Sequence, residues 1–396
     1  MLTCFCYLFF NPPIQIVEDA MKIAFVSDVV FPWHIGGVES MEYREMIALS
    51  KKDEVYCFCL QFPGMKKEFV KDGIHYVCVA SCGNGLYTKG GRRSVSIAML
   101  FGRSVYKHLK KHKFDMLYVN AFPYFHLPAV KRYCKESSSK LVLDVVEVWT
   151  IREWKDYLGN VKGIAAYWYM KRALLGADLY VCVSSVTSSK LAGIGIPGSK
   201  SLVFAPVLDL RSISKYKSGR KSSPMVIFAG RLIKEKGLDE WIGCVSAAHS
   251  ISDKINGLIV GTGPEYENVS GLIKSGHLDF ISITGTVRKR DSLYKKIAAS
   301  SVLLQTSRRE GLSAIVLESL ALGTPVILPD YTPIPEEVKR MCIVLPLGKI
   351  PGELASIASS DKSKFLRNVD GLSAFDCSAI PWRFGRIAKM LGLTGR

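Results

Sequence analysis

The sequence predicts an α/β protein made of two Rossmann-like domains. Short apolar runs alternate with longer helix-like stretches, which is the pattern of βαβ units and a parallel sheet. The pattern stops in a stretch rich in Ser, Lys, Arg and Gly at residues 212–223 and then starts again. The length of 396 residues suits two domains of ordinary size better than one.

The first domain is expected to span residues 21–210. It opens with a buried strand at 22–30, followed by a turn at Gly36 and Gly37 and a helix through about residue 50. Further strands are expected at residues 54–60, 74–80, 116–120, 141–148 and 179–185. Residues 1–20 include an apolar run of about ten residues, too short to span a bilayer and without the basic start of a signal peptide. We expect them to be an N-terminal extension.

The second domain is expected at residues 224–378, after a linker at 211–223. Its strands are expected at residues 224–230, 255–261, 280–285, 301–307 and 324–330. An apolar periodic stretch near the end predicts a closing C-terminal helix within residues 379–396. Two successive domains of this kind imply a cleft between them, with ligands at the carboxyl ends of the strands.

The net charge of +18 is spread over both halves of the chain, which therefore has no basic tail. A basic protein suits anionic ligands such as nucleotide diphosphates, and also anionic membrane surfaces. Clustered basic residues with interleaved aromatics, typical of nucleic-acid binding, are not evident, so we expect no nucleic-acid partner. The eleven cysteines lie mostly in apolar runs and predict reduced thiols in a cytoplasmic protein. Their spacing gives no zinc motif.

The strongest motif is SRREGLSAIVLESLALGTPVILPD at residues 307–330, which follows a strand–loop–helix–strand pattern. Glu310 precedes the helix and Glu318 lies inside it, so the two carboxylates could meet different parts of one elongated ligand. Between them Gly311, Leu312 and Ser313 offer backbone N–H groups at a helix N-terminus, where a phosphate is favoured. An amphipathic helix with a solvated glutamate at each end remains an alternative.

Two further segments add weaker signals. In FAGRLIKEKGLDEW (228–241), Arg231 and Lys236 follow a buried strand and could neutralise a diphosphate, although a solvated basic turn fits equally well. GTGPE (261–265) and FISITGT (280–286) each end a strand with a glycine turn. Taken alone, they are best interpreted as plain tight turns.

Together and in this order, these motifs resemble the donor-binding domain of the retaining GT-B glycosyltransferases of family four. The resemblance covers residues 224–330 strongly and 22–210 weakly. It implies the GT-B fold, with two Rossmann-like domains facing across a cleft. It also implies transfer of a hexose or amino sugar from a UDP- or GDP-sugar to a glycan or lipid-linked acceptor, in surface polysaccharide or glycan biosynthesis.

The resemblance also implies roles for single residues. Arg231 and Lys236 would hold the donor diphosphate and stabilise its charge as the sugar leaves. Glu310 would bind hydroxyls of the transferred sugar, and Glu318 those of the ribose. The backbone of Gly311, Leu312 and Ser313 would contact the phosphate. The remaining donor contacts would come from the turn against the base (Gly285, Thr286, Val287) and from the N-terminal glycine loop (Gly36, Gly37).

The acceptor side departs from the family pattern. Many members carry a histidine at the end of a mid-domain strand, where this chain has LDVVEVW with Asp144, Glu147 and Trp149. This resembles a variant of some amino-sugar transferases, and a strand end with satisfied carboxylates is the alternative. The family's usual P-N-G-V-D before the linker is APVLD (205–209) here.

No Asp-x-Asp metal clamp occurs, so we expect neither a metal nor a cofactor, and a front-face displacement fits a retaining enzyme of this type. Residues 90–113 and 157–175 mix aromatics with Lys and Arg, which suits either peripheral contact with an anionic membrane or solvated helix faces. The location expected is the cytoplasm or the inner face of the cell membrane. A nucleotide-sugar epimerase, a basic anion-binding or nucleic-acid-binding protein and an inactive relative remain alternatives.

Overall fold

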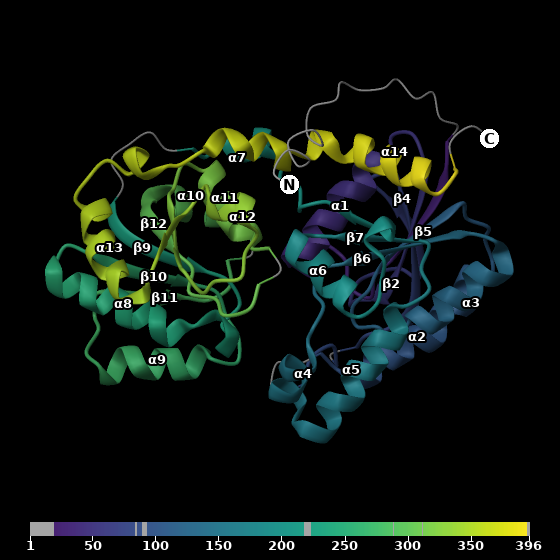
Figure 1. Cartoon of the computed structure of the whole chain (residues 1–396), viewed down its shortest axis with the longest axis horizontal. Helices are drawn as coiled ribbons and strands as arrows, with labels where there is room; N and C mark the ends of the chain where they lie inside the picture. The colour runs from purple at the N-terminus through teal and green to yellow at the C-terminus, as the bar shows by residue number, and fades with distance from the viewer. Residues whose placement is uncertain are drawn as a thin grey trace. The chain divides into compact units, whose positions relative to one another are not determined.

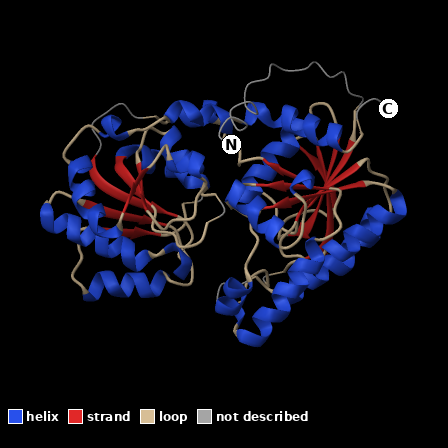
Figure 2. Cartoon of the chain, in the orientation of Figure 1, coloured by secondary structure: helices blue, strands red, loops and turns tan. Residues whose placement is uncertain are grey.

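The structure, a computed structural model, describes residues 20–83, 85–88, 93–217, 223–287, 289–310 and 312–393. This part of the chain forms two compact units. The first comprises the chain up to Val207 together with the residues from Cys377 onward, and the second comprises Leu208–Asp376. In each unit, helices cover both faces of a central sheet (Figure 1, Figure 2).

The sheet of the first unit has the strand order β3-β4-β2-β1-β5-β6-β7-β8 in the described part of the chain. Its pairings are parallel except for β3, which runs antiparallel to β4. The strands are β1 (Lys22–Val26), β2 (Glu54–Gln61), β3 (Glu68–Lys71), β4 (Ile74–Ser81), β5 (Met116–Asn120), β6 (Lys140–Val145), β7 (Leu179–Cys182) and β8 (Ser201–Val203). The helices are α1 (Gly37–Leu49), α2 (Val95–Leu109), α3 (Leu127–Ser137), α4 (Ile151–Leu158), α5 (Asn160–Leu174), α6 (Ser185–Gly193) and α14 (Ile380–Met390).

Two cores enclose this sheet. On one face α2, α3 and α5 bury Phe101, Val130 and Met170 against it. On the other face α1 and α14 bury Met46 and Phe384. Because both faces are covered, the inner strands are apolar along their whole length, which is why they are visible in the sequence as continuous runs.

The second unit has a parallel sheet in the order β11-β10-β9-β12-β13-β14. Its strands are β9 (Ser223–Ala229), β10 (Asn256–Val260), β11 (Ile281–Thr284), β12 (Ser300–Leu304), β13 (Val326–Pro329) and β14 (Ile343–Leu345). Its helices are α7 (Leu210–Ser214), α8 (Leu238–Ile251), α9 (Tyr266–Ser275), α10 (Arg290–Ala299), α11 (Ala314–Ala321), α12 (Glu336–Lys339) and α13 (Ile350–Ala358). Helices α8, α9 and α13 share one core with the sheet.

Both sheets are doubly wound, as the sequence predicts. In each sheet the chain adds strands outward in one direction and then in the other. This reversal of strand order lies between β1 and β5 in the first unit and between β9 and β12 in the second. Ligands of open α/β sheets bind beside the carboxyl ends of the strands at such a reversal. The loops that follow these four strands are therefore the places to look for a site.

Four strands end three or more residues earlier than expected, and those predicted at 179–185 and 301–307 end at Cys182 and Leu304. The strand predicted at 22–30 ends at Val26, and the one predicted at 141–148 ends at Val145. Apolar residues continue beyond these two strand ends because Val29, Val30 and Val148 are buried in the loops that follow. The short strands β3, β8 and β14 were not predicted.

The domain boundaries also differ in detail from those expected. The predicted linker at 211–223 starts inside α7, whose Ile213 is buried and whose first turn is capped by Asp209. Helix α7 packs on α11 and so belongs to the second unit. Only part of that stretch is described, since residues 218–222 lie outside the described ranges, as do residues 1–19 of the expected extension. The expected closing helix is α14, and it packs on α1 in the first unit.

Candidate functional site

The reversal in the second unit brings together residues that the sequence separates by more than seventy positions. Arg231 lies in the loop after β9, two residues beyond the strand end, and is exposed. Lys236 ends the short 3-10 turn Lys234–Lys236 in the same loop. Glu310 lies in the loop after β12, and its carboxylate forms an ion pair with the Lys236 ammonium. Side chains of this pair are only 20% and 10% exposed.

The local backbone explains why Lys236 reaches Glu310. Gly237 adopts a left-handed conformation with φ of +63°, and a Cβ at this position would lie 2.5 Å from the carbonyl oxygen of Thr306. The buried Thr306 hydroxyl donates to the carbonyls of Lys236 and Gly237 at 3.0 and 2.8 Å. The Arg308 N–H also donates to the Glu235 carbonyl at 2.9 Å. The two loops are thus joined along their backbones, and glycine is required at the contact.

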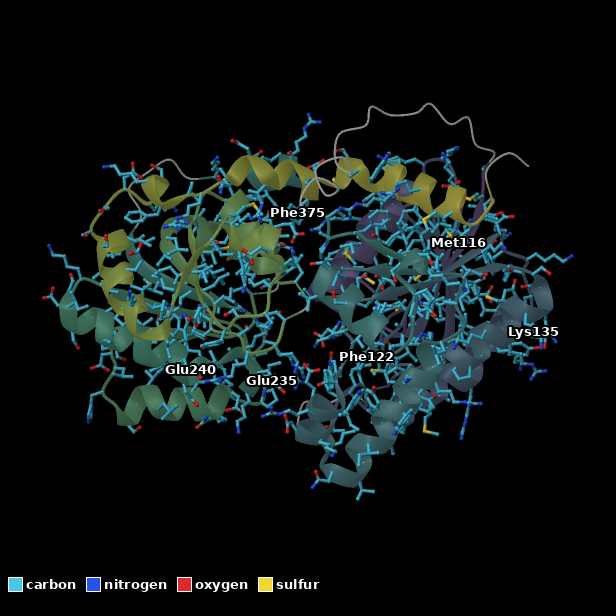
Figure 3. All side chains as sticks on the ribbon, in the orientation of Figure 1. Met116, Phe122, Lys135, Glu235, Glu240 and Phe375 are labelled. Atoms are coloured by element: carbon cyan, nitrogen blue, oxygen red, sulfur yellow. The ribbon has the colours of Figure 1, made fainter. Side chains whose placement is uncertain are left out.

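Glutamates flank this junction on its outer side, and Figure 3 labels Glu235 and Glu240. Arg308 donates to the Glu240 carboxylate at 3.0 Å, and Arg309 lies 3.8 Å from Glu235. These pairs add contacts between the same two loops.

Gln305 contacts the same oxygen of the Glu310 carboxylate as Lys236 does. Its amide nitrogen donates to Glu310 Oε1 at 3.0 Å and to the hydroxyl of Ser307 at 2.6 Å. In the described part of the chain the hydrogen bonds of this carboxylate all end on Oε1. The arrangement can therefore hold one carboxylate oxygen in place while the other meets a ligand.

Glu318 lies deeper, on α11, and is 2% exposed. Its Oε1 pairs with the guanidinium of Arg290 and accepts from the hydroxyl of Tyr294 at 3.2 Å. Arg290 also donates to that hydroxyl at 3.1 Å. Burial works to lower the pKa of Arg290, but the charges of Glu318 and Tyr294 and the hydrogen bonds to both together outweigh it, so the pKa is raised. Sequence reasoning missed Arg290 and Tyr294 because nothing in the local sequence links them to a residue 28 positions away.

The other predicted donor residues lie at the same edge of this sheet. Leu312 and Ser313 immediately precede α11, and Ser313 is its N-cap. Gly311 lies outside the described residues. Gly285, Thr286 and Val287 follow β11, with the first two exposed and Val287 half-buried. Leu312, Ser313 and the residues Gly285–Val287 follow parallel strands, so they share the carboxyl edge with Glu310.

The turn GTGPE has a packing role. A Cβ at Gly261 would lie 1.9 Å from the carbonyl oxygen of Gly230, and one at Gly263 would lie 2.2 Å from that of Leu232. The Leu232 N–H donates to the Thr262 carbonyl at 3.0 Å. These glycines let the loop after β10 lie against the loop that carries Arg231.

In the first unit, Gly36 and Gly37 stand at the N-terminus of α1, in the loop that follows β1 at the reversal point. Gly36 is the N-cap and Gly37 is the exposed first residue of the helix. Gly36 has extended backbone, and a Cβ there would lie 2.1 Å from a carboxylate oxygen of Glu39. Glu39 lies 2.9 Å from the ring of His34.

The predicted acceptor residues do not form one constellation. Asp144 is 1% exposed on β6, and neither of its carboxyl oxygens has a hydrogen-bond partner in the described part of the chain. Glu147 is exposed and accepts from the indole of Trp149 at 2.6 Å. Trp149 packs on Trp154 with ring centroids 4.7 Å apart. Glu147 is therefore exposed and Trp149 half-buried against the core, while Asp144 lies in the interior.

Asp144 belongs to a buried acidic cluster with Glu42 and Glu45 of α1. Burial, and after it the neighbouring carboxyl groups, raise the pKa of Glu42 and Asp144 well above their usual range. Burial raises the pKa of Glu45 to about 8, against the opposing charge of Arg383 on α14. Asn120, at the end of β5, donates to Glu42 at 2.7 Å. Burial therefore favours the protonated form of each acid in this cluster.

The described residues show no group of three or more His, Cys, Asp or Glu side chains placed to hold a metal ion. None of the nine described cysteines forms a disulfide bond within the described part of the chain. Among the described helices, none combines the length and the apolar character needed to cross a membrane.

Solved structures with this fold define the class of protein. The chain matches sucrose-phosphate synthase from Thermosynechococcus elongatus with a TM-score of 0.74 and 15% identity, over 95% of this chain and 100% of that one. It matches Anabaena HepE, solved in complex with UDP and glucose, with a TM-score of 0.65 and 14% identity, over 93% and 99%. At such identity the likeness shows the fold alone, and the fold is GT-B, as predicted.

The family follows from the sequence comparisons. The family model Glycosyl transferases group 1 matches residues 211–341, and the model Glycosyltransferase Family 4 matches residues 35–211. Together they span more than half of the chain. The chain belongs to this glycosyltransferase family, and the predicted family resemblance is confirmed.

Curated relatives match only in part. A GDP-mannose-dependent alpha-(1-6)-phosphatidylinositol monomannoside mannosyltransferase of Mycobacterium tuberculosis (strain CDC 1551 / Oshkosh) is 30% identical over 42% of this chain and 47% of that protein. A putative teichuronic acid biosynthesis glycosyltransferase of Bacillus subtilis (strain 168) is 32% identical over 27% and 24%. The chain spans at most about half the length of these relatives.

Proposed function

We propose that this protein is a retaining glycosyltransferase. It transfers a hexose or an amino sugar from a UDP- or GDP-sugar to a glycan or lipid-linked acceptor, in the assembly of a surface polysaccharide or another glycan. The observation that carries the proposal is the Lys236–Glu310 pair at the reversal point between β9 and β12, because it combines a cation for phosphate with a carboxylate for sugar hydroxyls.

The two proposed donor classes, UDP-sugars and GDP-sugars, are suggested by the names of similar proteins. The mycobacterial protein is named as GDP-mannose-dependent, and the Anabaena protein was solved with UDP and glucose. Both ligands are nucleoside diphosphates, so the same cations serve either one. In this proposal the turn at Gly285–Val287 contacts the nucleotide base.

Each residue has a proposed task. Arg231 and Lys236 neutralise the diphosphate, and the amides of Leu312 and Ser313 contact a phosphate at the start of α11. Glu310 binds hydroxyls of the transferred sugar through Oε2, since its described hydrogen bonds end on Oε1. Glu318 binds the ribose in the same way. The roles of Gly36, Gly37, Glu147 and Trp149 stay predictions.

The reaction we propose is a front-face displacement. The acceptor hydroxyl oxygen forms a bond to the anomeric carbon while the bond from that carbon to the donor phosphate oxygen breaks. The hydroxyl proton passes to that phosphate oxygen, and the nucleoside diphosphate leaves. Arg231 and Lys236 stabilise the growing negative charge on the leaving group, so that no metal or cofactor is needed.

A thermal-shift titration with UDP, GDP, ADP and their sugar conjugates tests the donor site. A nucleotide at about 100 times its dissociation constant adds roughly 2.7 kcal/mol of stability to the folded state. We expect one nucleotide series to raise the melting temperature and Lys236→Ala to remove the response. A shift caused by duplex or single-stranded nucleic acid, with none from any nucleotide, would contradict the proposal and favour a basic nucleic-acid-binding protein.

The anomeric configuration of the product tests the mechanism. NMR of the glycoside formed from an α-linked donor sugar is expected to show an α-linked product. A β-linked product would show inversion and overturn the retaining mechanism. Release of the free epimerised sugar nucleotide, without transfer, would instead identify an epimerase on the same fold.

A lipid-linked acceptor would place the protein at the inner face of the cell membrane as a peripheral protein. The net charge of +18 supports contact with an anionic surface. Extraction of the acceptor from membranes with organic solvent, followed by transfer from a radiolabelled donor, tests this part of the proposal. Label that stays entirely in the aqueous phase would favour a soluble glycan acceptor.

A further inference from the structure

Helix α5 presents an unusual surface in the first unit. Its inward side buries Gly163, Met170, Ala173 and Leu174. The opposite side carries a second set of apolar residues, Val161, Ile164, Trp168 and, just past the helix end, Leu175. We call this set the α5 outer face. Its members repeat at intervals of three, four and seven residues, which places them along one side of a helix.

The outer face is strongly exposed. Val161 is 82% exposed and Trp168 is 57% exposed. Isolated exposed apolar residues are normal, but a continuous exposed stripe of large apolar side chains marks a surface that contacts something else. Ile164 and Leu175 are 38% and 40% exposed, so Val161 and Trp168 supply most of the exposed apolar surface of this face.

The charge around the stripe indicates its partner. Helix α5 carries three cations, Lys162, Lys171 and Arg172, and its fifteen residues include no carboxylate. The Lys171 ammonium lies 5.4 Å from the centre of the Trp168 ring, so a cation and the tryptophan share one position on the surface. A helix with a Trp-containing apolar stripe edged by lysine and arginine suits the headgroup region of an anionic bilayer.

Self-association fits less well. A two-fold contact through this stripe would bring the same three cations of each copy together with no acid on α5 to offset them. Four side chains on one short helix also fall well below the roughly 800 Å² per partner of a stable interface. An anionic lipid surface offers both the apolar layer and the opposite charge.

We propose that the α5 outer face docks the first unit on the surface of an anionic membrane, with Val161, Ile164, Trp168 and Leu175 inserted among the headgroups. This inference deepens the proposed function, in which the acceptor is lipid-linked, by naming the surface that brings the protein to that acceptor. Binding to lipid needs no sugar transfer, so the two proposals can fail separately.

Vesicle flotation tests the docking surface. The full chain is mixed with vesicles of phosphatidylcholine alone, or of equal parts phosphatidylcholine and phosphatidylglycerol. We expect it to float with the anionic vesicles, to bind the neutral ones much less, and to be released by salt. The double variant Val161→Glu with Trp168→Glu is expected to bind the anionic vesicles at least about tenfold more weakly.

Ile251→Glu is the matched control, because Ile251 is 60% exposed at the end of α8 in the second unit. It is expected to float like the unmodified protein. Nucleotide-induced thermal shift reports folding of every variant and tests the donor site independently. Unchanged flotation of the double variant would overturn the proposal. A protein that is a dimer in solution and becomes a monomer in the double variant would also overturn it, since the stripe would then be a self-association surface.

Discussion

At the scale of single residues, the Lys236–Glu310 pair is the centre of the proposed donor site. Replacing Lys236 by alanine removes a cation placed for the leaving diphosphate. We expect the turnover number for sugar transfer to fall by about 10²–10³, the usual loss when one preorganised electrostatic contact is removed. Steady-state kinetics with saturating donor and acceptor measures this loss.

Lys234→Ala is the control for that variant. Lys234 lies in the same 3-10 turn but is exposed. We expect it to transfer sugar at nearly the unmodified rate. Equal losses in the two variants would indicate that only the overall positive charge of the loop matters.

Arg290 and Tyr294 hold Glu318 in place and so prepare it for the ribose. Both contact Glu318 Oε1. We expect the unmodified protein to bind its nucleoside diphosphate about 10-fold to 150-fold more tightly than the 2′-deoxy form, the range for a hydrogen bond to a charged group. In Arg290→Met that ratio should fall towards one, because the carboxylate loses its orientation. Isothermal titration calorimetry with both nucleotides measures the ratio.

Comparing the two nucleotides distinguishes a loss of Glu318 positioning from a general loss of protein stability. A general loss of stability in Arg290→Met would weaken both nucleotides equally and leave the ratio unchanged. Arg290→Lys keeps a cation beside Glu318 and should restore part of the ratio. Lys289→Met, at the exposed neighbouring position, should leave it unaltered.

At the scale of secondary-structure elements, the site depends on the contact between the loops after β9 and β12. Gly237 is left-handed and lies against Thr306. Gly237→Ala should destabilise the protein by about 1–3 kcal/mol, because it forces an L side chain into a strained conformation and into a carbonyl oxygen. It should also weaken donor binding, since Lys236 moves with its loop. Chemical denaturation and nucleotide titration measure the two effects.

Gly243→Ala provides the matched control inside the following helix. Gly243 is exposed in α8, and a Cβ there would meet no atom within 4 Å. Alanine should stabilise the helix by up to about 1 kcal/mol. A Gly237→Ala protein as stable as Gly243→Ala would contradict the role given to the loop contact.

At the scale of the whole molecule, the buried carboxyl groups of the first unit make stability depend on pH. Glu45 has a folded pKa of about 8 against an unfolded value of 4.5. The folded protein holds this proton between those values, so the contribution to stability is complete below about pH 4.5 and is lost as the pH rises to 8. The loss is up to about 1.4 kcal/mol per pH unit. Glu45→Gln carries no such proton and should gain stability relative to the unmodified protein across this window.

Denaturation of both proteins at matched pH values measures that difference. Other groups titrate in the same range, including His126, whose pKa burial lowers to about 4. Its contribution has the opposite sign, because the unfolded state takes up its proton first as the pH falls. The comparison at equal pH removes such shared contributions. A constant stability gap from pH 5 to pH 8 would show that folding does not raise the pKa of Glu45.

The sequence by itself determined the fold class and placed the proposed donor residues at one edge of the second sheet. Buried parallel strands are apolar on both faces, so strands such as β5 and β9 stand out as continuous runs. Arg231, Lys236 and Glu310 follow strand ends, and the carboxyl ends of parallel strands share one edge. The motif order gave the family.

Only the tertiary structure decided which side chains meet. The partnership of Arg290 with Glu318, the burial of Asp144 and the exposure of Trp168 depend on how separate elements pack, and local patterns do not encode that. The predicted motif LDVVEVW divides at the end of β6, with Asp144 in the interior, Glu147 exposed and Trp149 half-buried. In α5, apolar residues lie on both sides of the helix, so the sequence does not show which side is buried. The periodicity of the sequence shows which residues share a side of a helix. Only the packing of the helix against its neighbours decides which side is exposed to solvent.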